Sequence, residues 1–148
     1  MQKRVDDRTV GEIMARSPVV VKSDADLRTL KRMFEAHDFN MFPVVDAAGR
    51  IVGVVSKLDF LRAFRPDPRR LVPDLRTLWA ERAGDIMSRS VLSVHPDDLV
   101  ATAADVMLEW RARSLPVVEG RGRASALVGV VSRTDVLRCL MLEDDDPD

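Results

Sequence analysis

The sequence predicts an α+β fold in which two copies of a β-α-β-β-α unit pack through their sheets with pseudo-two-fold symmetry. Three observations lead to this prediction. The chain of 148 residues repeats itself, and repeats define architecture more strongly than local propensity does. Short apolar runs alternate with segments of helical apolar spacing. Each copy spans only about 60 residues, which buries little core alone, so the two copies need each other.

The repeat is visible as two matching blocks. Residues 11–45 match residues 84–118 at an offset of 73, and 11 of these 35 positions are identical. Three additional residues then change the offset to 76, where residues 51–62 match residues 127–138 at eight of twelve positions. Because both blocks occur in the same order, we interpret the chain as a tandem duplication.

Each copy is expected to begin with a short helix and a short strand. Thr9-Val10-Gly11-Glu12 has the form of a capping box, which predicts a helix through Met14. Short apolar runs predict strands at residues 19–21 and 92–94.

A longer helix should follow in each copy. Asp24 and Asp97 are the expected N-caps. Apolar residues then recur at helical spacing within residues 27–34 and 100–110.

Two strands and a final helix complete the unit. Residues 42–45 predict a strand with its proline at the start, where a missing N–H is tolerated. Residues 46–50 predict a hairpin loop that leads into a strand at residues 51–55. The last helix should begin near Leu58.

The domain organisation follows from the repeat. We expect one repeat at 9–64, a linker with a short helix at 65–82, the second repeat at 83–141 and an acidic tail at 142–148. The linker contains one apolar helical stripe, formed by Leu75, Leu78 and Trp79. We interpret this stripe as a helix packed on the module, and a partner-binding surface is the alternative.

Composition excludes several classes of protein. A net charge of −1 argues against nucleic-acid binding through bulk charge. The polar N-terminus does not resemble a signal peptide, and no apolar run is long enough to cross a membrane. The single cysteine, Cys139, indicates a reducing compartment, so we expect a cytoplasmic protein. With only His37 and His95 beside it, neither a metal cluster nor a catalytic site is expected.

The most similar stretches of the two copies are strand-to-helix turns, Gly53–Asp59 and Gly129–Asp135. A Ser-x-x-Asp sequence before an apolar helical run predicts a capping box, which needs no ligand. The same residue types also suit a nucleotide, because a hydroxyl can bond phosphate or ribose and a carboxylate can accept both hydrogen bonds of a ribose diol. Lys57 and Arg133 add positive charge beside the serines. Sequence alone leaves both interpretations open.

Taken together, these motifs resemble a pair of CBS domains, also called a Bateman module. The resemblance rests on Gly-x-Ile-Met at Gly11 and Gly84, on Pro-Val-Val at Pro43 and Pro116, and on the two Gly-Val-Val-Ser-x-x-Asp turns. It extends over residues 9–141, which leaves no room for a catalytic domain.

The resemblance implies an adenosine-containing ligand in the clefts between the repeats: AMP, ADP or ATP, with S-adenosylmethionine as a further possibility. It implies that Asp59 and Asp135 hold ribose hydroxyls, and that Ser56 and Ser132 face ribose or phosphate. The candidate binding residues are Ser56, Lys57, Asp59, Ser132, Arg133, Asp135, Arg113, Met41, Ser114, Val19, Val20 and Leu92.

The two sites are expected to be unequal. Before the Pro-Val-Val strand, where the family often contacts phosphate, the first copy has Asn40 and Met41 whereas the second has Arg113 and Ser114. An arginine can meet phosphate with a planar fork, and methionine cannot.

The function implied is a regulatory module without catalysis, which binds an adenine nucleotide and signals to an unidentified protein through a conformational or oligomeric change. A homodimer is the expected assembly. No nucleic acid, membrane or obligatory cofactor is expected. The alternative is a structural dimerisation or protein-interaction module that binds no ligand.

Overall fold

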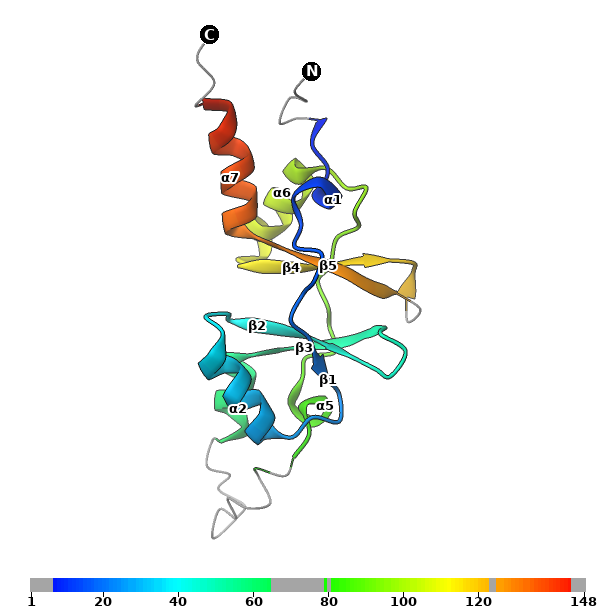
Figure 1. Cartoon of the computed structure of the whole chain (residues 1–148), viewed down its shortest axis with the longest axis vertical. Helices are drawn as coiled ribbons and strands as arrows, with labels where there is room; N and C mark the ends of the chain where they lie inside the picture. The colour runs from blue at the N-terminus through cyan, green and yellow to red at the C-terminus, as the bar shows by residue number, and fades with distance from the viewer. Residues whose placement is uncertain (1–6, 65–78, 80, 123–124, 145–148) are drawn as a thin grey trace. The chain divides into compact units, whose positions relative to one another are not determined.

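The two repeats exchange their first helices. The computed structural model describes residues 7–64, 79, 81–122 and 125–144. The chain divides into two units: unit 1 combines the segment up to Pro18 with the segment from Leu92, and unit 2 spans Val19–Val91. Each unit therefore contains the first helix of one repeat and the remaining elements of the other (Figure 1). Both units mix helices with a small sheet, which confirms the α+β class.

The sheet of unit 2 has three strands in the order β1-β2-β3. They are β1 (Val21–Lys22), β2 (Met41–Val45) and β3 (Ile51–Ser56). β1 pairs parallel with β2, and β2 pairs antiparallel with β3. The predicted hairpin loop between β2 and β3 is confirmed: Asp46 accepts from the backbone N–H groups of Ala48 and Arg50, and Gly49 has a φ of 79°.

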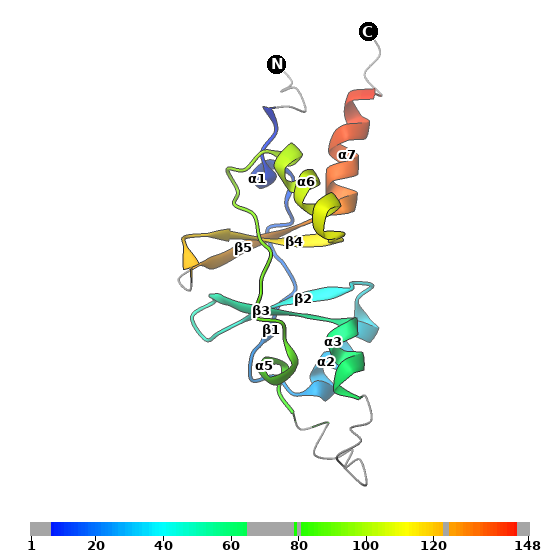
Figure 2. The same ribbon diagram turned by 180° about the vertical axis from the view of Figure 1, so that it is seen from behind.

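Three helices cover one face of this sheet (Figure 2). They are α2 (Leu27–Ala36), α3 (Lys57–Ala63) and α5 (Ala83–Ile86). The buried core between helices and sheet consists of Val21, Leu27, Leu30, Phe42, Val44, Val55 and Ala83.

Unit 1 repeats this plan around an antiparallel hairpin of β4 (Ser114–Glu119) and β5 (Ala126–Ser132). Its helices are α1 (Val10–Ile13), α6 (Val100–Trp110) and α7 (Arg133–Asp144), which also lie on one face of the hairpin (Figure 1). The buried core consists of Val10, Val94, Val100, Ala103, Met107, Leu115, Val117, Val131, Val136 and Cys139.

Two glycines allow the exchanged segments to approach the sheets. The segment after α5 pairs with β3 through Val54 and Ser88. A Cβ on Gly53 would lie 2.6 Å from Met87 Sδ and 2.7 Å from the carbonyl oxygen of Ser88. Gly129 in unit 1 is equally crowded, with Met14 Sδ and the carbonyl oxygen of Ala15 both at 2.7 Å. The repeated Gly-Val-Val sequence therefore reflects close backbone approach.

The predicted N-caps of the longer helices were wrong by two residues. Asp26, not Asp24, caps α2, and its side chain accepts from Thr29 N. Residues 25–27 are held extended by backbone hydrogen bonds to residues 81–83, so the helix cannot begin earlier.

In the second copy α6 begins at Val100 after Leu99, which makes no side-chain cap, and not after Asp97. Backbone hydrogen bonds between residues 8–10 and 98–100 keep the residues before α6 extended as well.

The start of each copy also differs from expectation. Thr9 makes no side-chain cap; its hydroxyl donates to the Glu12 carboxylate at 3.4 Å, and α1 ends at Ile13. The strand expected at 19–21 is β1 at Val21–Lys22. The strand expected at 92–94 is reduced to a single parallel bridge from Val94 to Val117.

Two further predictions concern the proline and the linker. Pro43 lies in the middle of β2, opposite Val54, and not at its start. The β1 pairing begins one residue later, at Val44, so no partner needs the missing N–H.

Most of the linker stripe lies outside the described residues; only Trp79 is described, and it contacts the core of unit 2.

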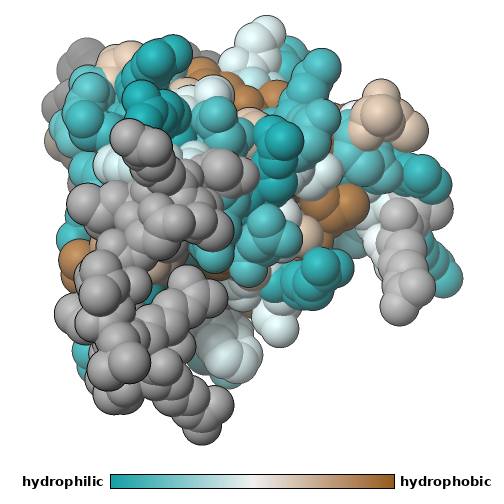
Figure 3. Space-filling view, turned by 90° about the horizontal axis from the view of Figure 1, so that it is seen from below, coloured by the Kyte–Doolittle hydropathy of each residue, from teal (hydrophilic) through white to brown (hydrophobic). Residues whose placement is uncertain are grey.

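The surface in Figure 3 is largely hydrophilic, with apolar residues in small separate patches. Within the part of the chain that the structure describes, no helix is long and apolar enough to cross a membrane.

Candidate functional site

The turn between β3 and α3 closes as a capping box. The Ser56 hydroxyl accepts from Asp59 N at 3.1 Å and donates to Asp59 Oδ2 at 2.9 Å. The same Oδ2 accepts from Ser56 N at 2.9 Å. The Asp59 side chain is only 12% exposed, and its Oδ1 lies 3.7 Å from an exposed Arg62 guanidinium. The serine proton and one carboxylate oxygen are therefore already used within the protein.

The turn between β5 and α7 has the same geometry. Ser132 Oγ accepts from Asp135 N at 3.1 Å and donates to Asp135 Oδ2 at 2.9 Å, and Ser132 N donates to that oxygen at 2.8 Å. The capping prediction is confirmed in both copies. Because both turns are complete without a ligand, the serines and aspartates alone do not demonstrate a nucleotide site.

In each unit the turn lies beside the start of the neighbouring strand. Ser56 pairs with Met41, and Lys57 N donates to the carbonyl oxygen of Asn40 at 3.0 Å. In unit 1, Ser132 pairs with Ser114, and its neighbour Arg133 N donates to the carbonyl oxygen of Arg113 at 3.0 Å. The structure thus brings the turn residues together with the residues expected before each Pro-Val-Val strand.

Strand register places the other candidate residues at the same end of each sheet. Val21 pairs parallel with Val44. Val19 and Val20 come before Val21 in the chain, so they lie toward the end of the sheet where β2 begins at Met41. In the same way Leu92 precedes the parallel bridge from Val94 to Val117, on the side of Ser114. Val20 is 36% exposed, and Val19 and Leu92 are half-buried.

The basic residues differ between the units. Arg133 Nε donates to the carbonyl oxygen of Ala112 at 2.9 Å, and its Nη2 donates to that of Arg111 at 3.0 Å. These bonds fix the guanidinium on the loop after α6 and use part of its donor capacity. Lys57 is exposed and makes no ion pair among the described residues. Arg113 is also exposed, at the position where unit 2 has Asn40.

This arrangement offers chemistry for binding. Each unit provides half-buried hydroxyl and carboxylate oxygens, apolar valine or leucine side chains and at least one cation at one end of a sheet. Such a set suits a ligand with an apolar ring, a diol and an anionic group. No group of three His, Cys, Asp or Glu that could hold a metal ion occurs in the described ranges.

Sequence reasoning missed the cap at Asp26, because Asp24 offers the same residue type two positions earlier. It also missed the exchange of α1 and α5 between the units and the hydrogen bonds from Arg133 to the loop after α6. A further missed feature is a groove between α6 and α7, with Leu108 on its rim. Comparing the repeats provides a signal for it, since Leu108 stands where the first copy has Glu35.

Comparisons with known proteins agree with this description. The chain is 28% identical over 160 residues to the uncharacterized protein MJ1426 of Methanocaldococcus jannaschii, covering 88% of this chain and 94% of that protein. The crystal structure of CBSX2 of Arabidopsis thaliana in complex with AMP is similar, with 28% identity, a TM-score of 0.76, and coverage of 92% of this chain and 98% of that chain.

Longer relatives include enzymes. The chain is 25% identical to L-aspartate semialdehyde sulfurtransferase of M. jannaschii over 87% of this chain, but it spans only 22% of that enzyme's length. The CBS domain model matches residues 10–66 and 83–142, which together form most of the sequence. The chain therefore belongs to the CBS domain family, with two tandem repeats.

Proposed function

We propose that this CBS pair is a regulatory module without catalysis of its own, which binds an adenosine-containing ligand of the AMP, ADP or ATP class at its Ser-x-x-Asp turns. The observation that supports it best is the repeated grouping of hydroxyl, carboxylate, apolar and basic residues at one sheet end of each unit. The similarity to CBSX2, which was solved with AMP, points to the ligand class. S-adenosylmethionine is a further candidate of the same chemistry.

The proposed contacts follow the geometry of each turn. Asp59 and Asp135 would accept from ribose hydroxyls through Oδ1, since Oδ2 is used in the capping box. Arg113 would meet phosphate in unit 1, where its counterpart in unit 2 is Asn40. We expect tighter phosphate binding at the turn of unit 1, because an arginine fork gives charge-assisted hydrogen bonds.

The signal would be a shift in conformation or in association between copies. A ligand favours whichever state binds it better, so the output depends on a difference in affinity between two states. We propose a homodimer and a separate regulated protein, which together would read the energy state of a cytoplasmic compartment.

The test is isothermal titration calorimetry with AMP, ADP, ATP and S-adenosylmethionine on the full chain. We expect binding at ligand concentrations below about 1 mM, and loss of the binding event at the turn of unit 1 in Asp135→Ala. Because that variant also loses a helix cap, Asp26→Ala is the matched control, since it removes a cap from α2 without touching a candidate binding residue. If none of the four ligands binds the native chain, the proposal is wrong.

A structural dimerisation module is the second candidate. It is favoured by the closed capping boxes, which account for both Ser-Asp pairs without any ligand. It predicts that ligands leave the melting temperature unchanged, while Ser56→Ala and Ser132→Ala still destabilise the protein.

A further inference from the structure

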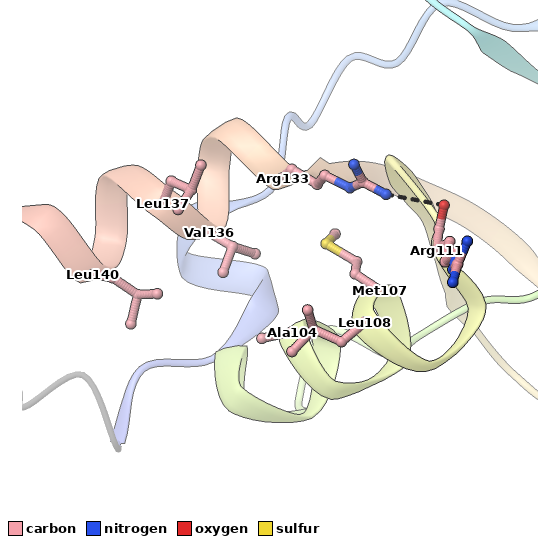
Figure 4. A pocket seen from close by; sticks show the side chains of 8 residues that line it. All are labelled: Ala104, Met107, Leu108, Arg111, Arg133, Val136, Leu137 and Leu140. Atoms are coloured by element: carbon pink, nitrogen blue, oxygen red, sulfur yellow. Dashed lines mark hydrogen bonds between the residues drawn. The ribbon is translucent and has the colours of Figure 1, made fainter.

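Helices α6 and α7 of unit 1 border an open groove of about 380 Å³. Its floor is formed by Met107 and Val136, which are both only 5% exposed, and Leu108 on its rim is 78% exposed. A volume of this size lies within the range of small-molecule sites, which are mostly apolar and have few polar groups. The apolar lining consists of Ala104, Met107, Leu108, Val136, Leu137 and Leu140 (Figure 4).

The polar part of the lining is confined to one end of the groove. Arg111 from the end of α6 and Arg133 from the start of α7 lie together there, and Leu140 lies at the other end (Figure 4). The spacing of Arg133 and Leu140 on α7 corresponds to a groove length of roughly 10 Å. None of the described residues that line the groove is acidic. The groove therefore has an apolar body and a cationic end.

Both guanidinium groups can bind an anion. Neither forms an ion pair with any of the residues that the structure describes. Arg133 donates from Nε to the carbonyl oxygen of Ala112 at 2.9 Å and from Nη2 to that of Arg111 at 3.0 Å, which fixes its side chain. Its Nη1 has no hydrogen-bond partner in the described part of the chain. Cations without a counter-ion beside apolar surface complement an amphiphile with an anionic head group.

Arg111 has a backbone conformation that favours glycine. It ends α6 with a φ of 54° and a ψ of 33°, in the left-handed region. Glycine or asparagine is the usual residue where a helix ends in this way, because a Cβ is strained there. The arginine therefore lowers stability relative to glycine, and what it adds at this position is a cation at the end of the groove.

The corresponding face of unit 2 has different charges. Asp38 stands where unit 1 has Arg111, so the charge at that position is reversed. Lys31 and Glu35 stand where unit 1 has Ala104 and Leu108, and they form an exposed ion pair at 3.4 Å. The cationic end and the apolar rim are therefore properties of unit 1 and not of the repeated fold.

The apolar space of the groove is also specific to unit 1. Its floor and far end correspond in unit 2 to Phe34, Phe60 and Phe64. These rings pack against one another, with centroid distances of 6.1 Å for Phe34–Phe60 and 4.9 Å for Phe60–Phe64. Large aromatic side chains fill the space that the smaller residues of unit 1 leave open.

We propose that the groove between α6 and α7 binds a free amphiphilic carboxylate, such as a medium-chain fatty acid, with its carboxylate at Arg111 and Arg133. A guanidinium can donate two parallel hydrogen bonds to a carboxylate, which would orient the head group. The alkyl chain would cover the floor and the exposed leucines, and burial of this apolar area would supply affinity. This inference goes beyond the proposed function, since of these residues only Arg133 is also a candidate for nucleotide binding.

The first experiment compares three ligands by isothermal titration calorimetry on the full chain: decanoate, decyltrimethylammonium and acetate. We expect decanoate to bind with a Kd of about 1 mM or below. Decyltrimethylammonium has the same alkyl chain and the opposite charge, so it should bind at least about 10-fold more weakly. Acetate lacks the chain and should not bind measurably. Equal binding of the two amphiphiles would overturn the proposal, because the arginines would then contribute nothing.

Arg111→Gly separates the head-group contact from effects on folding. Glycine relieves the left-handed strain, so the melting temperature should not fall. The affinity for decanoate should nevertheless fall by about 10-fold, because one cation is lost. Arg138→Gln is the control, since Arg138 is exposed on α7 outside the groove lining, and it should keep the wild-type affinity. An unchanged affinity in Arg111→Gly would overturn the proposal.

Leu108→Glu tests the apolar rim with the residue that unit 2 has at the corresponding position. The added carboxylate repels the ligand's charge and disfavours its alkyl chain, so we expect decanoate to bind at least about 10-fold more weakly. Leu61→Glu is the control, because Leu61 is 67% exposed on α3 of unit 2 and should not affect the groove. Circular dichroism checks that both variants fold. Equal affinities in the two variants would contradict a chain in this groove.

Competition and sedimentation experiments exclude other occupants. AMP should leave decanoate binding unchanged; displacement would instead assign the arginines to the nucleotide phosphate and overturn the proposal. If decanoate does not bind and Leu108→Glu changes the sedimentation coefficient, another protein chain covers the groove and the proposal is wrong. If decanoate does not bind but the chain floats with phosphatidylglycerol vesicles, the face meets a membrane and the proposal is equally wrong. If decanoate binds as expected and no adenosine ligand binds, this inference stands while the proposed function fails.

Discussion

Asp59 Oδ2 lies 2.9 Å from both the backbone nitrogen and the hydroxyl oxygen of Ser56. One carboxylate oxygen therefore accepts two hydrogen bonds at the N-terminus of α3, and these bonds fix the rotamer of the serine. A ligand at this turn would meet a pre-formed site, in which Asp59 Oδ1 and a lone pair of the serine oxygen already have defined positions. Pre-organisation of this kind reduces the entropic cost of binding, so the cap and the proposed ligand site can use the same residues.

Replacing the capping serine should destabilise either unit. Ser56→Ala removes one hydrogen bond to the Asp59 N–H and one to its carboxylate, and we expect a loss of about 1 kcal/mol in the free energy of unfolding. Ser132→Ala should lose a similar amount, because its hydrogen bonds have the same lengths. Urea unfolding followed by circular dichroism measures both. Equal stability of the two alanine variants and the wild type would contradict a capping role.

A side chain on Gly53 should disrupt the contact between α5 and β3. The Cβ of Gly53→Ala would meet Met87 Sδ at 2.6 Å and the carbonyl oxygen of Ser88 at 2.7 Å. The methionine can move, but the backbone oxygen is held by the hydrogen bonds between Val54 and Ser88. We expect a loss of about 1–3 kcal/mol in the free energy of unfolding, measured by urea unfolding.

Gly49→Ala is the control for this substitution. Gly49 has a φ of 79° and nothing within 4 Å of an added Cβ, so only backbone strain changes. We expect a loss of about 1 kcal/mol there. If Gly53→Ala costs no more than this, the pairing of the exchanged segment with β3 is looser than the structure indicates.

The stability of unit 2 should fall in acid through Asp26. The backbone N–H of Thr29, and after it the Thr29 hydroxyl, lower the pKa of the Asp26 carboxyl below its ordinary value of 3.8. A lowered pKa stabilises the folded protein at pH values above the ordinary one, and this stabilisation is lost as the pH falls through the folded value. The free energy of unfolding of Asp26→Asn should therefore fall less than that of the wild type between about pH 5 and about pH 3.

Thr29→Ala distinguishes the two donors in this experiment. It retains the backbone N–H and removes the hydroxyl. The fall in its free energy of unfolding on acidification should therefore lie between those of the wild type and Asp26→Asn. Asp46, whose pKa is lowered by the backbone N–H of Arg50, should account for part of the remaining acid dependence. Identical pH profiles for all of these variants would contradict the assigned cause.

The duplicated motifs predicted much of the fold, because local rules determine them. The Ser-x-x-Asp turns, the hairpin loop at Asp46 and the strand at Ile51 depend on neighbours within a few residues, and all three appear as expected. The helix starts at Leu27 and Val100 did not follow local rules. Backbone pairing with segments more than 50 residues away holds the preceding residues extended, and no local pattern reports such a contact.

In the candidate site, too, the sequence predicted some features and not others. The register of β2 with β3 brings Met41 to Ser56, and the resemblance to the CBS family had placed both among the candidate binding residues. The exchange of α1 and α5 between units was not predicted, although the strand glycines at 53 and 129 are a signal for close backbone approach. The side-chain bonds of Arg133 to carbonyl oxygens of the loop after α6 also escaped prediction, because that loop turns through Arg111 in a left-handed conformation with a φ of 54°.

The two turns should bind phosphate unequally, and Arg113 is the residue that tests this. Its guanidinium is exposed beside the Ser132 turn, and the corresponding residue of unit 2 is an asparagine. Arg113→Gln keeps a polar side chain of similar length but removes the charge. We expect it to weaken ATP binding by about 10-fold, the loss typical of one charge-assisted hydrogen bond, and to leave adenosine binding within about two-fold.

Calorimetric titration of ATP, AMP and adenosine measures this difference. Arg121→Gln is the control, because Arg121 is an exposed arginine on the β4–β5 loop, outside the candidate residues. It removes the same charge and should leave all three affinities unchanged. A uniform weakening of all ligands in Arg113→Gln would instead indicate that the arginine orders the start of β4, through the hydrogen bond from Arg133 N to its carbonyl oxygen. Equal weakening of ATP in both variants would assign the effect to net charge, and the two turns would then have no reason to differ.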